Sequence, residues 1–496
     1  MVRLKIEIVE PAMKIPLDRQ SPEPVYLQIR DRIRGLIQSG GLKAGDRLPS
    51  IRKMAQTVQV NKLTVIEAYS VLEADGLIHA RQGSGYFINQ QPLKRPKVES
   101  NFAPAQTVII PEDGVRSFLD VSNAILRSQR DPDFINLGSG FPQATGMDDL
   151  QRIARRAVKN ISSRLFDHTY PQGEPHFREQ ITQLLVQLGL GTSPENIIVT
   201  NGSMQALALL VQHFIEPGDW VVVSAPTFHG FLSLLDQAHA RVIGIPMTRG
   251  GINLELLEDY LHSHRPKLIY TISTMHNPTG ITTDLSHRRQ LLNLAEQYDC
   301  LIIEDNAYER LTFDPSPPPI KALDNSDRVI YVNTFSKTLM PAIRVGYMVV
   351  TGDAYQLLLE RKLLHDFHVS VVSQAIVSEY LATGHYRRRL NQLKETNQQN
   401  QAVMLQALED HFPAGASWTI PNGGFFLWVH LPEHLSLNAI AHAAAKKKLY
   451  VGPGSMFFPD QQGYPALRLS FAHSIEDIQV GIALLGDIIR QQMKAA

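Results

Sequence analysis

The sequence has one cysteine, no long apolar run and no internal repeat, and each absence excludes a class of protein. Cys300 is the single cysteine, so an intramolecular disulfide is impossible. No uninterrupted apolar run approaches the roughly 18 residues that a membrane-spanning helix needs. The start of the chain shows no secretory signal peptide, which together with the missing disulfides predicts a cytoplasmic protein. The absence of repeats and low-complexity tracts excludes a repeat array and a largely disordered chain.

The chain also lacks a net charge, but its charges are unevenly distributed. Basic and acidic residues number 48 each over 496 residues. Residues 1–95 hold 15 Lys and Arg against 9 Asp and Glu, whereas the rest of the chain has an acidic excess. This asymmetry suggests that the N-terminal part meets a polyanion, with an accident of composition as the alternative. The length exceeds what one hydrophobic core fills, so at least two domains are expected.

The N-terminal part shows three helical patterns followed by two strand-like runs. Apolar residues from Tyr26 to Ile37 recur at helical spacing, and Gly40 stops the pattern. Ser50 and Asn61 are suited to cap a second and a third helix. The runs LIHA and YFI, joined by a glycine-containing loop, predict a β-hairpin with a basic tip. Three helices and such a hairpin make a winged helix-turn-helix.

A winged helix-turn-helix predicts particular contacts to DNA. The start of its third helix enters the major groove, which exposes Lys62, Leu63 and Thr64 toward the bases. Arg52 and Arg81 can reach phosphates or a groove edge. An interaction module with solvated basic residues is the alternative.

The segments PVYLQI, GDRLPSIRKMA, NKLTVIEAYSVLEADGLI and RQGSGYFI resemble, in order and spacing, the DNA-binding domain of the GntR family. The resemblance covers nearly all of residues 24–88 and implies binding to a double-stranded DNA operator. Lys62 and Met54 depart from the Arg and Leu often found there, which bears on the operator sequence. The following residues are rich in Pro and polar side chains and lack a sustained period, which is typical of a linker. We therefore predict a winged helix-turn-helix at 20–89, a linker at 90–125 and a second domain at 126–496.

Beyond residue 130, short apolar runs such as WVVVSA, CLIIED and VIYVNTF alternate with helical stretches. This pattern predicts an α/β fold with a largely parallel sheet covered by helices, whose ligands gather at the strand ends. Lys337 follows one such run, where a pyridoxal phosphate protein presents its amine for a Schiff base. Asp305 can pair with the pyridine nitrogen of that cofactor, and Asn277 and Tyr308 can bond its phenolic oxygen. For each residue alone, a solvent-facing lysine, a helix cap and a simple turn are the alternatives.

The phosphate of such a cofactor needs hydrogen-bond donors and positive charge. The segment IIVTNGSMQALALL indicates a strand, a turn and a helix, so Gly202, Ser203 and the Met204 amide lie at a helix N-terminus. Further donors come from a later segment: Thr334, Ser336 and Arg344.

Two more residues suit the ring and the amino compound. Phe228 can stack on the pyridine face, with an ordinary core aromatic as the alternative. Arg468, on a buried strand, needs a partner, and the carboxylate of a substrate or effector is the candidate, with an internal salt bridge as the alternative. No metal site is expected.

The ordered motifs YPQGEPHFREQI, TNGSMQAL, APTFHGF, HNPTG, EDNAY, TFSKTLMPAIRVGY and ALRLSFA resemble fold-type I aminotransferases from about residue 130 to the end. The resemblance implies a pyridoxal phosphate domain with a mainly parallel sheet and a smaller C-terminal α+β subdomain. It also implies a homodimer in which Tyr170 reaches the cofactor phosphate of the neighbouring subunit. Phe228 stands where the family often has Tyr, so stacking is kept but a hydroxyl contact is lost.

A GntR-type winged helix fused to such a domain is the layout of the MocR subfamily of bacterial regulators. By resemblance, the chain is a transcription regulator whose large domain binds pyridoxal phosphate and senses an amino compound or the cofactor itself. A working aminotransferase with an accessory DNA-binding module is the alternative, because all groups for transamination are present. The intact basic winged helix favours regulation.

Overall fold

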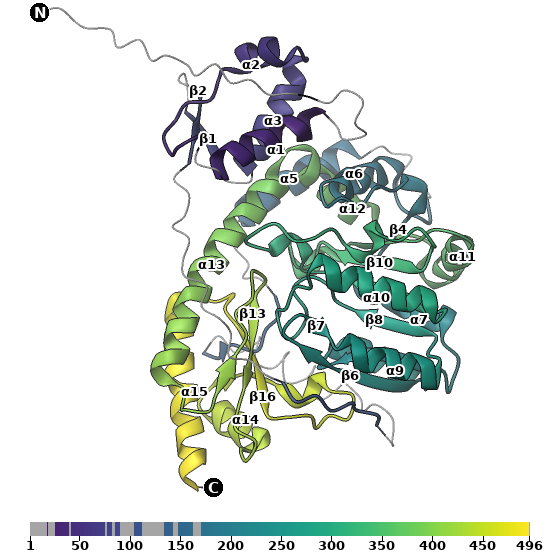
Figure 1. The fold of residues 1–496 in the computed structure, drawn as a ribbon, viewed down its shortest axis with the longest axis vertical. Helices are drawn as coiled ribbons and strands as arrows, with labels where there is room; N and C mark the ends of the chain where they lie inside the picture. The colour runs from purple at the N-terminus through teal and green to yellow at the C-terminus, as the bar shows by residue number, and fades with distance from the viewer. Residues whose placement is uncertain are drawn as a thin grey trace, which may run out of the picture. The chain divides into compact units, whose positions relative to one another are not determined.

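The computed structural model describes residues 17, 25–38, 41–74, 77–81, 85–89, 104–111, 133–141, 147–161 and 170–495 (Figure 1). The chain divides into two units, Met1–Val98 and Glu99–Ala496. Within the described ranges, no helix combines the length and the apolar character that a membrane span needs.

The first unit contains three helices and a two-stranded antiparallel sheet. These elements are α1 (Val25–Gln38), α2 (Ile51–Val58), α3 (Lys62–Ala74), β1 (Ile78–Arg81) and β2 (Gly85–Ile88). Ser50 caps α2 by accepting a hydrogen bond from the Lys53 amide, and Asn61 Oδ1 accepts one from the Leu63 amide at the start of α3. Both predicted caps are confirmed. Residues 82–84 of the hairpin loop lie outside the described residues.

The core of the first unit follows the predicted apolar faces. Ile29 and Ile33 of α1, Met54 of α2 and Val65 and Leu72 of α3 are all completely buried. The spacing of four residues in α1 and of seven in α3 places each pair on one face of its helix, and the three helices meet in one cluster.

An eight-stranded sheet forms the centre of the second unit, in the order β4-β11-β10-β9-β8-β5-β6-β7. Its strands are β4 (Ile197–Thr200), β5 (Trp220–Ala225), β6 (Arg241–Thr248), β7 (Gly251–Ile252), β8 (Leu268–Thr271), β9 (Leu301–Asp305), β10 (Val329–Thr334) and β11 (Gly346–Val349). Neighbours run parallel except at β11, which is antiparallel to both β4 and β10, and at β7. The apolar runs of the sequence are strands of this sheet, so the predicted α/β fold class is confirmed.

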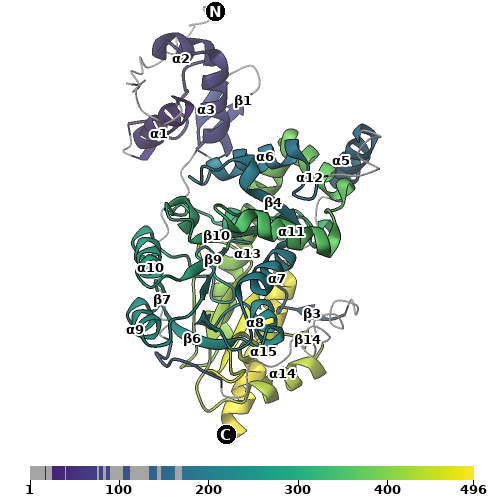
Figure 2. The same ribbon diagram turned by 90° about the vertical axis from the view of Figure 1, so that its right-hand side faces the viewer.

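Helices cover both faces of this sheet (Figure 2). One face carries α7 (Ser203–Phe214), α8 (His229–Gln237) and α11 (Ala354–Asp366), and the other carries α9 (Leu254–His264) and α10 (Leu285–Gln297). Successive residues of β5 show why: Val221 and Val223 pack with α7 and α8, whereas Val222 packs with α9 and α10. Because both faces are covered, the strands are apolar at nearly every position.

A smaller α+β part is built from the C-terminal residues, which confirms the predicted subdomain. Its four-stranded sheet has the order β12-β13-β16-β15. Its elements are α13 (His385–His411), β12 (Ser417–Trp418), β13 (Phe426–His430), α14 (Leu437–Lys446), β15 (Gly452–Pro453), β16 (Ala466–Ser470) and α15 (Ile475–Ala495). A separate pair, β14 (Leu449–Tyr450) and β3 (Ile135–Asn136), joins the early part of this unit to the C-terminal part.

Three further α-helices lie among the described residues of the second unit: α5 (Met147–Asn160), α6 (Pro175–Val186) and α12 (Val371–Ala382). Leu150 and Ile153 of α5 and Phe177 of α6 pack with Tyr380 of α12 in one apolar cluster. α5 contacts α12 directly.

Part of the predicted linker makes defined contacts with the second unit. Ile109 forms an antiparallel bridge with Gly244 of β6, with hydrogen bonds of 2.9 and 2.8 Å between the two backbones. The Gln106 side chain donates to the Met247 carbonyl and accepts from Asn253 Nδ2. Residues 104–111 therefore lie along β6, which the linker composition did not indicate. The other residues between 90 and 125 lie outside the described ranges.

Candidate functional site

The turn after β4 forms one end of a polar site. Gly202 has a φ of 77° and leads directly into α7, and a Cβ at this position would lie 2.5 Å from Arg344 Nη2. Arg344 donates to Ser336 Oγ at 3.3 Å and to the Asn201 carbonyl at 2.9 Å. The guanidinium therefore lies over the helix start at Ser203, where the free amides of a first turn attract an anion.

The end of β10 contributes hydroxyl groups to the same place. Thr334 Oγ1 lies 3.1 Å from Ser336 Oγ and accepts the Ser336 amide at 3.1 Å. Arg344 contacts Ser336, so this pair and the Gly202 turn border one space. Met204 lies in the first turn of α7 and is 36% exposed. The structure thus brings together the six predicted phosphate-binding residues.

A carboxylate from α11 supports this turn, and the sequence did not indicate it. Asp366 Oδ2 accepts hydrogen bonds from Asn201 Nδ2 at 2.6 Å and from Gln205 Nε2 at 2.9 Å. Its other oxygen pairs with Lys362, which is completely buried. The charge of Asp366 is thus balanced while it fixes the residue before Gly202.

The amine of Lys337 lies deeper in the site, enclosed although part of its side chain is exposed. Its Nζ donates to the Gly140 carbonyl at 2.9 Å and lies 3.5 Å from the centroid of the Phe141 ring and 5.4 Å from that of Tyr308. Burial, with a smaller contribution from the Arg468 charge, lowers the pKa of Lys337 to about 7. Among the described residues no carboxylate pairs with this amine, so much of it is neutral and nucleophilic near neutral pH.

Asp305 ends β9 and is a buried carboxylate with one unmatched oxygen. Tyr270 donates to Oδ2 at 2.9 Å, whereas Oδ1 has no hydrogen-bond partner in the described structure. Burial raises the pKa of Asp305 to about 6. An uncompensated carboxylate oxygen is costly in a protein interior, so this atom calls for a donor that the described residues do not supply.

Arg468, on β16, is buried at the opposite end of the site. It donates to Asn277 Oδ1 at 2.9 Å and to the Gly138 carbonyl at 2.7 Å. The rings of Phe426 and Phe457 lie about 5 Å from its guanidinium carbon. No described carboxylate forms a salt bridge with it, so the internal ion pair that was the alternative is absent there, and a charged guanidinium faces the site unneutralised.

Phe228 and its neighbour His229 follow β5. Phe228 is partly buried, and its ring lies edge to face against His229 at 4.9 Å. His229 is buried beside Phe457, and burial together with the charges of Arg468 and Lys337 lowers its pKa well below the usual range. His229 therefore borders the site as a neutral imidazole. The sequence singled out Phe228 and missed His229.

Tyr170 stands apart from the other predicted residues. Its side chain is 49% exposed, and no hydrogen bond or ring contact joins it to the site. Its carbonyl accepts the Gly173 amide in a turn before α6.

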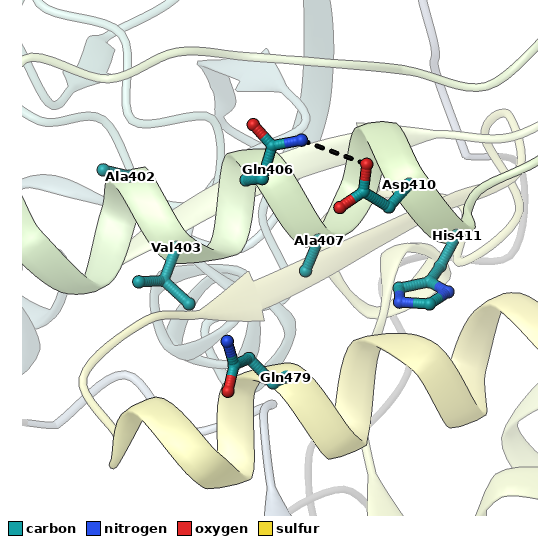
Figure 3. A pocket seen from close by; sticks show the side chains of 7 residues that line it. All are labelled: Ala402, Val403, Gln406, Ala407, Asp410, His411 and Gln479. Carbon is teal, nitrogen blue, oxygen red and sulfur yellow. Dashed lines mark hydrogen bonds between the residues drawn. The ribbon is translucent and has the colours of Figure 1, made fainter.

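A groove of about 520 Å³ between α13 and α15 lies away from these residues (Figure 3). It is lined by Ala402, Val403, Gln406, Ala407, Asp410, His411 and Gln479. The Asp410 carboxylate is already bonded to Gln406, and the lining holds no unpartnered buried charge. The groove lacks the convergent polar groups of the site described above.

The first unit carries the residues predicted to meet DNA. Lys62 and Leu63 begin α3 and are exposed, Leu63 to 69%, whereas Thr64 is half-buried. Arg52 is exposed on α2. Arg81 ends β1, exposed, with its guanidinium 5.6 Å from the Phe87 ring. The structure thus presents charged and apolar side chains at the start of one helix.

Comparison with known families divides the chain as the structure does. Residues 25–88 match the bacterial regulatory proteins of the gntR family, and residues 132–485 match the class I and II aminotransferases. An uncharacterized HTH-type transcriptional regulator of Bacillus subtilis, YdfD, is 30% identical over 97% of this chain and 99% of its own length. An uncharacterized aminotransferase of Saccharolobus solfataricus is 34% identical over 74% of this chain and 94% of its own.

Solved structures resemble the second unit. The kynurenine aminotransferase of Pyrococcus horikoshii, crystallised with PMP, is 30% identical, with a TM-score of 0.72 over 76% of this chain and 95% of its own. The α-aminoadipate aminotransferase LysN of Thermus thermophilus, bound to N-(5'-phosphopyridoxyl)-L-leucine, is 27% identical, with a TM-score of 0.72 over 77% of this chain and 97% of its own.

Proposed function

The chain belongs to the class I and II aminotransferases and carries a gntR-family DNA-binding module, and from this premise we propose that it is a transcription regulator that senses an amino compound. The proposal rests on two features of one chain. The start of α3 is exposed, and the second unit has a buried site that holds the enclosed amine of Lys337 and the unneutralised guanidinium of Arg468. Relatives that span the whole chain bear the names of transcriptional regulators, which supports the same conclusion.

Pyridoxal phosphate is the cofactor of the second unit, and the residues present fit it. The unmatched Asp305 oxygen suits a protonated pyridine nitrogen, and the space that Gly202 leaves beside Arg344 suits the phosphate. The bound cofactor supplies an aldehyde that condenses with amines and a ring that withdraws electrons. Lys337 would supply the amine for covalent attachment, and Thr334 and Ser336 would hold the phosphate through their hydroxyl groups.

The effector is an amino compound that carries a carboxylate. Lys337 would give up its place to the amine of the effector, and the effector carboxylate would pair with Arg468, whose fork geometry matches two oxygens. Asn277 and the Gly138 carbonyl hold the guanidinium in place before the effector arrives. The rings of Phe426 and Phe457 exclude water from the pair and so strengthen it.

The segment at Ile109 offers a route from this site to the first unit. Ile109 packs against a cluster that contains Phe457 and Phe458, and Phe457 also contacts Arg468. A shift of Phe457 on carboxylate binding would therefore reach residues 104–111. In this proposal residues 90–125 connect the module at 20–89 with the domain at 126–496 and carry that shift.

We further propose that the regulator is a homodimer in which Tyr170 completes the partner's cofactor site. Apolar side chains are unusually exposed near the phosphate end: Met204, Leu364, Phe367 and Val372. Leu364 is 88% exposed and Phe367 is 68% exposed, and Asp366 between them bonds to Asn201. A partner subunit that covers these residues removes the cost of exposing them. Because the protein reads DNA, we place it in the cytoplasm.

A DNA-binding assay with effector tests the main proposal. An operator is selected from random duplexes with the full-length protein, and its affinity is measured with and without pyridoxal phosphate and a panel of amino acids. We expect one amino acid to change the affinity by roughly 5–150-fold, and by linkage the operator must change the affinity for that amino acid by the same factor.

Rapid transamination without any response of DNA binding would contradict the proposed regulatory function. If the protein transaminates common amino acids at about 1–1000 per second, as enzymes typically do, and its DNA affinity ignores every amine, it is an enzyme with an accessory module. The completeness of the cofactor site is the observation that favours this second candidate.

A further inference from the structure

A stripe of basic residues runs along the outer face of α5 in the second unit. Arg152, Arg155, Arg156 and Lys159 follow the spacing i, i+3, i+4 and i+7, and all four are exposed. The opposite face holds Leu150, Ile153 and Ala157, which are buried. The helix therefore has one apolar stripe and one basic stripe.

The start of α13 extends this stripe into a patch. Arg152 Nη2 lies 3.2 Å from His385 Nε2, and Asp149 lies within electrostatic range of Arg152, His385 and Arg388. Residues 147–160 and 384–394 together contain eight Lys and Arg but only two acidic residues. The remainder of the second unit has an acidic excess, so the patch is a local exception.

Two of the four basic side chains of the α5 stripe have an acidic partner and two have none within the described structure. Arg152 pairs with Asp149 and Arg156 pairs with Glu379. Arg155 and Lys159 have no acidic partner among the described residues. Like charges at i, i+3 and i+4 destabilise a helix, so the stripe has an intrinsic cost that a bound polyanion would remove.

We infer that this patch, the α5 patch, is a second binding surface for the DNA backbone, used by the duplex that flanks the operator. The inference rests on the proposed function, because that function supplies the DNA. From Arg152 to Lys159 the helix rises about 10 Å, which spans roughly three phosphates of one strand. Side chains of this kind contact phosphates without reading bases, so the surface adds affinity but no sequence preference. A duplex already held by the first unit stays at high local concentration near it.

The test compares a minimal operator with one extended by about 20 base pairs of arbitrary sequence on each side, using the full-length protein. Affinity is measured over a series of salt concentrations. We expect the extended duplex to bind more tightly and with a steeper salt dependence. In the variant R155Q/K159Q, which removes only residues without an acidic partner, the slope on the extended duplex should fall by about two units, since each phosphate contact contributes about 0.9.

The minimal operator separates this inference from the proposed function. R155Q/K159Q should bind it as the wild type does, and the visible absorbance of the bound cofactor should be unchanged. The matched control K446Q/K447Q removes two exposed lysines of the same unit near the end of α14. Equal losses in both variants, an unchanged slope in R155Q/K159Q, or a wild type indifferent to duplex length would each overturn the α5 patch. Failure of the wild type to bind any operator would instead overturn the DNA-binding function on which it rests.

Discussion

The two units present their functional residues in opposite environments. In the first unit, Arg52, Lys62 and Leu63 are exposed side chains on two neighbouring helices. In the second, Asp305 and Arg468 are buried, and they come from strands more than 160 residues apart in the chain. The exposed residues keep their water until DNA arrives, whereas the buried ones lose it on folding and have perturbed pKa values as a result. Single substitutions in the first unit should therefore weaken DNA binding only partly. Single substitutions in the second unit should abolish covalent attachment of the cofactor or recognition of the effector.

The largest effect is expected for Lys337→Ala. This variant should lose completely the visible absorbance that covalent attachment of the cofactor produces. The cofactor should still bind without the covalent bond, because Arg344, Ser336 and the start of α7 remain. Absorbance spectra of the purified protein measure the covalent bond, and the amount of pyridoxal phosphate released on denaturation measures binding of the cofactor. Lys446→Ala, which removes an exposed lysine, serves as the control. An unchanged spectrum in Lys337→Ala would show that another residue carries the cofactor.

The next effect in size concerns the carboxylate of the effector. In Arg468→Ala, affinity for a carboxylated amine should fall by about 10–150-fold, since a hydrogen bond to a charged group contributes about 1.5–3 kcal/mol. Affinity for the same amine without its carboxylate should change little. Titration of the visible spectrum measures both, and the retained covalent absorbance shows that the site is intact. If both amines lose affinity equally, Arg468 shapes the site instead of binding the carboxylate.

The sequence predicted local features well because short-range patterns encode them. Ser50 and Asn61 cap helices as expected, and the apolar runs became strands. Motifs placed at the ends of parallel strands came together because such ends share one edge of a sheet. The contacts that the sequence missed join elements distant in the chain: Gly140 with Lys337, Asp366 with Asn201, and Ile109 with Gly244. No period or motif marks these pairs, since each depends on how complete elements pack.

In the first unit, we expect Lys62→Ala to weaken operator binding only partly. Operator affinity should fall severalfold, and if Lys62 contacts a phosphate the slope of log affinity against log salt should flatten by about one unit. The cofactor spectrum should not change. Lys43→Ala, another exposed lysine of the same unit, is the matched control. Equal slopes in wild type and Lys62→Ala would mean that this side chain does not meet the backbone.

The smallest expected effect is a pH dependence of the stability of the second unit. Glu309 is buried next to Tyr308, its Oε1 has no described hydrogen-bond partner, and burial raises its pKa to about 7. The folded state therefore holds this proton more tightly than the unfolded state, so its contribution to stability is present below about pH 4.5 and is lost as pH rises through about 7. Glu309→Gln mimics the protonated acid. Its melting temperature should match the wild type at pH 5 and exceed it by about a few degrees at pH 8.

Two controls test whether the pH dependence of the melting temperature comes from Glu309. Glu258→Gln changes an exposed carboxylate and should leave the melting temperature unchanged at both pH values. The described residues of the first unit bury no charged side chain, so operator affinity should not follow the Glu309 titration. A Glu309→Gln variant less stable than the wild type at pH 8 would show that the carboxylate is ionised and bound to a group not identified above.

The hydrogen bonds that hold Arg468 in place have a consequence for timing. Because Asn277 and Gly138 already orient the guanidinium, a carboxylate finds its partner without waiting for a side chain to rearrange. Differences between amino acids should then lie in how long each one stays rather than in how fast it arrives. A matching effector would keep the protein in its altered state after the free concentration of that effector has fallen. Through Arg468, the regulator would in this way respond to the effector for some time after the supply of that metabolite has ended.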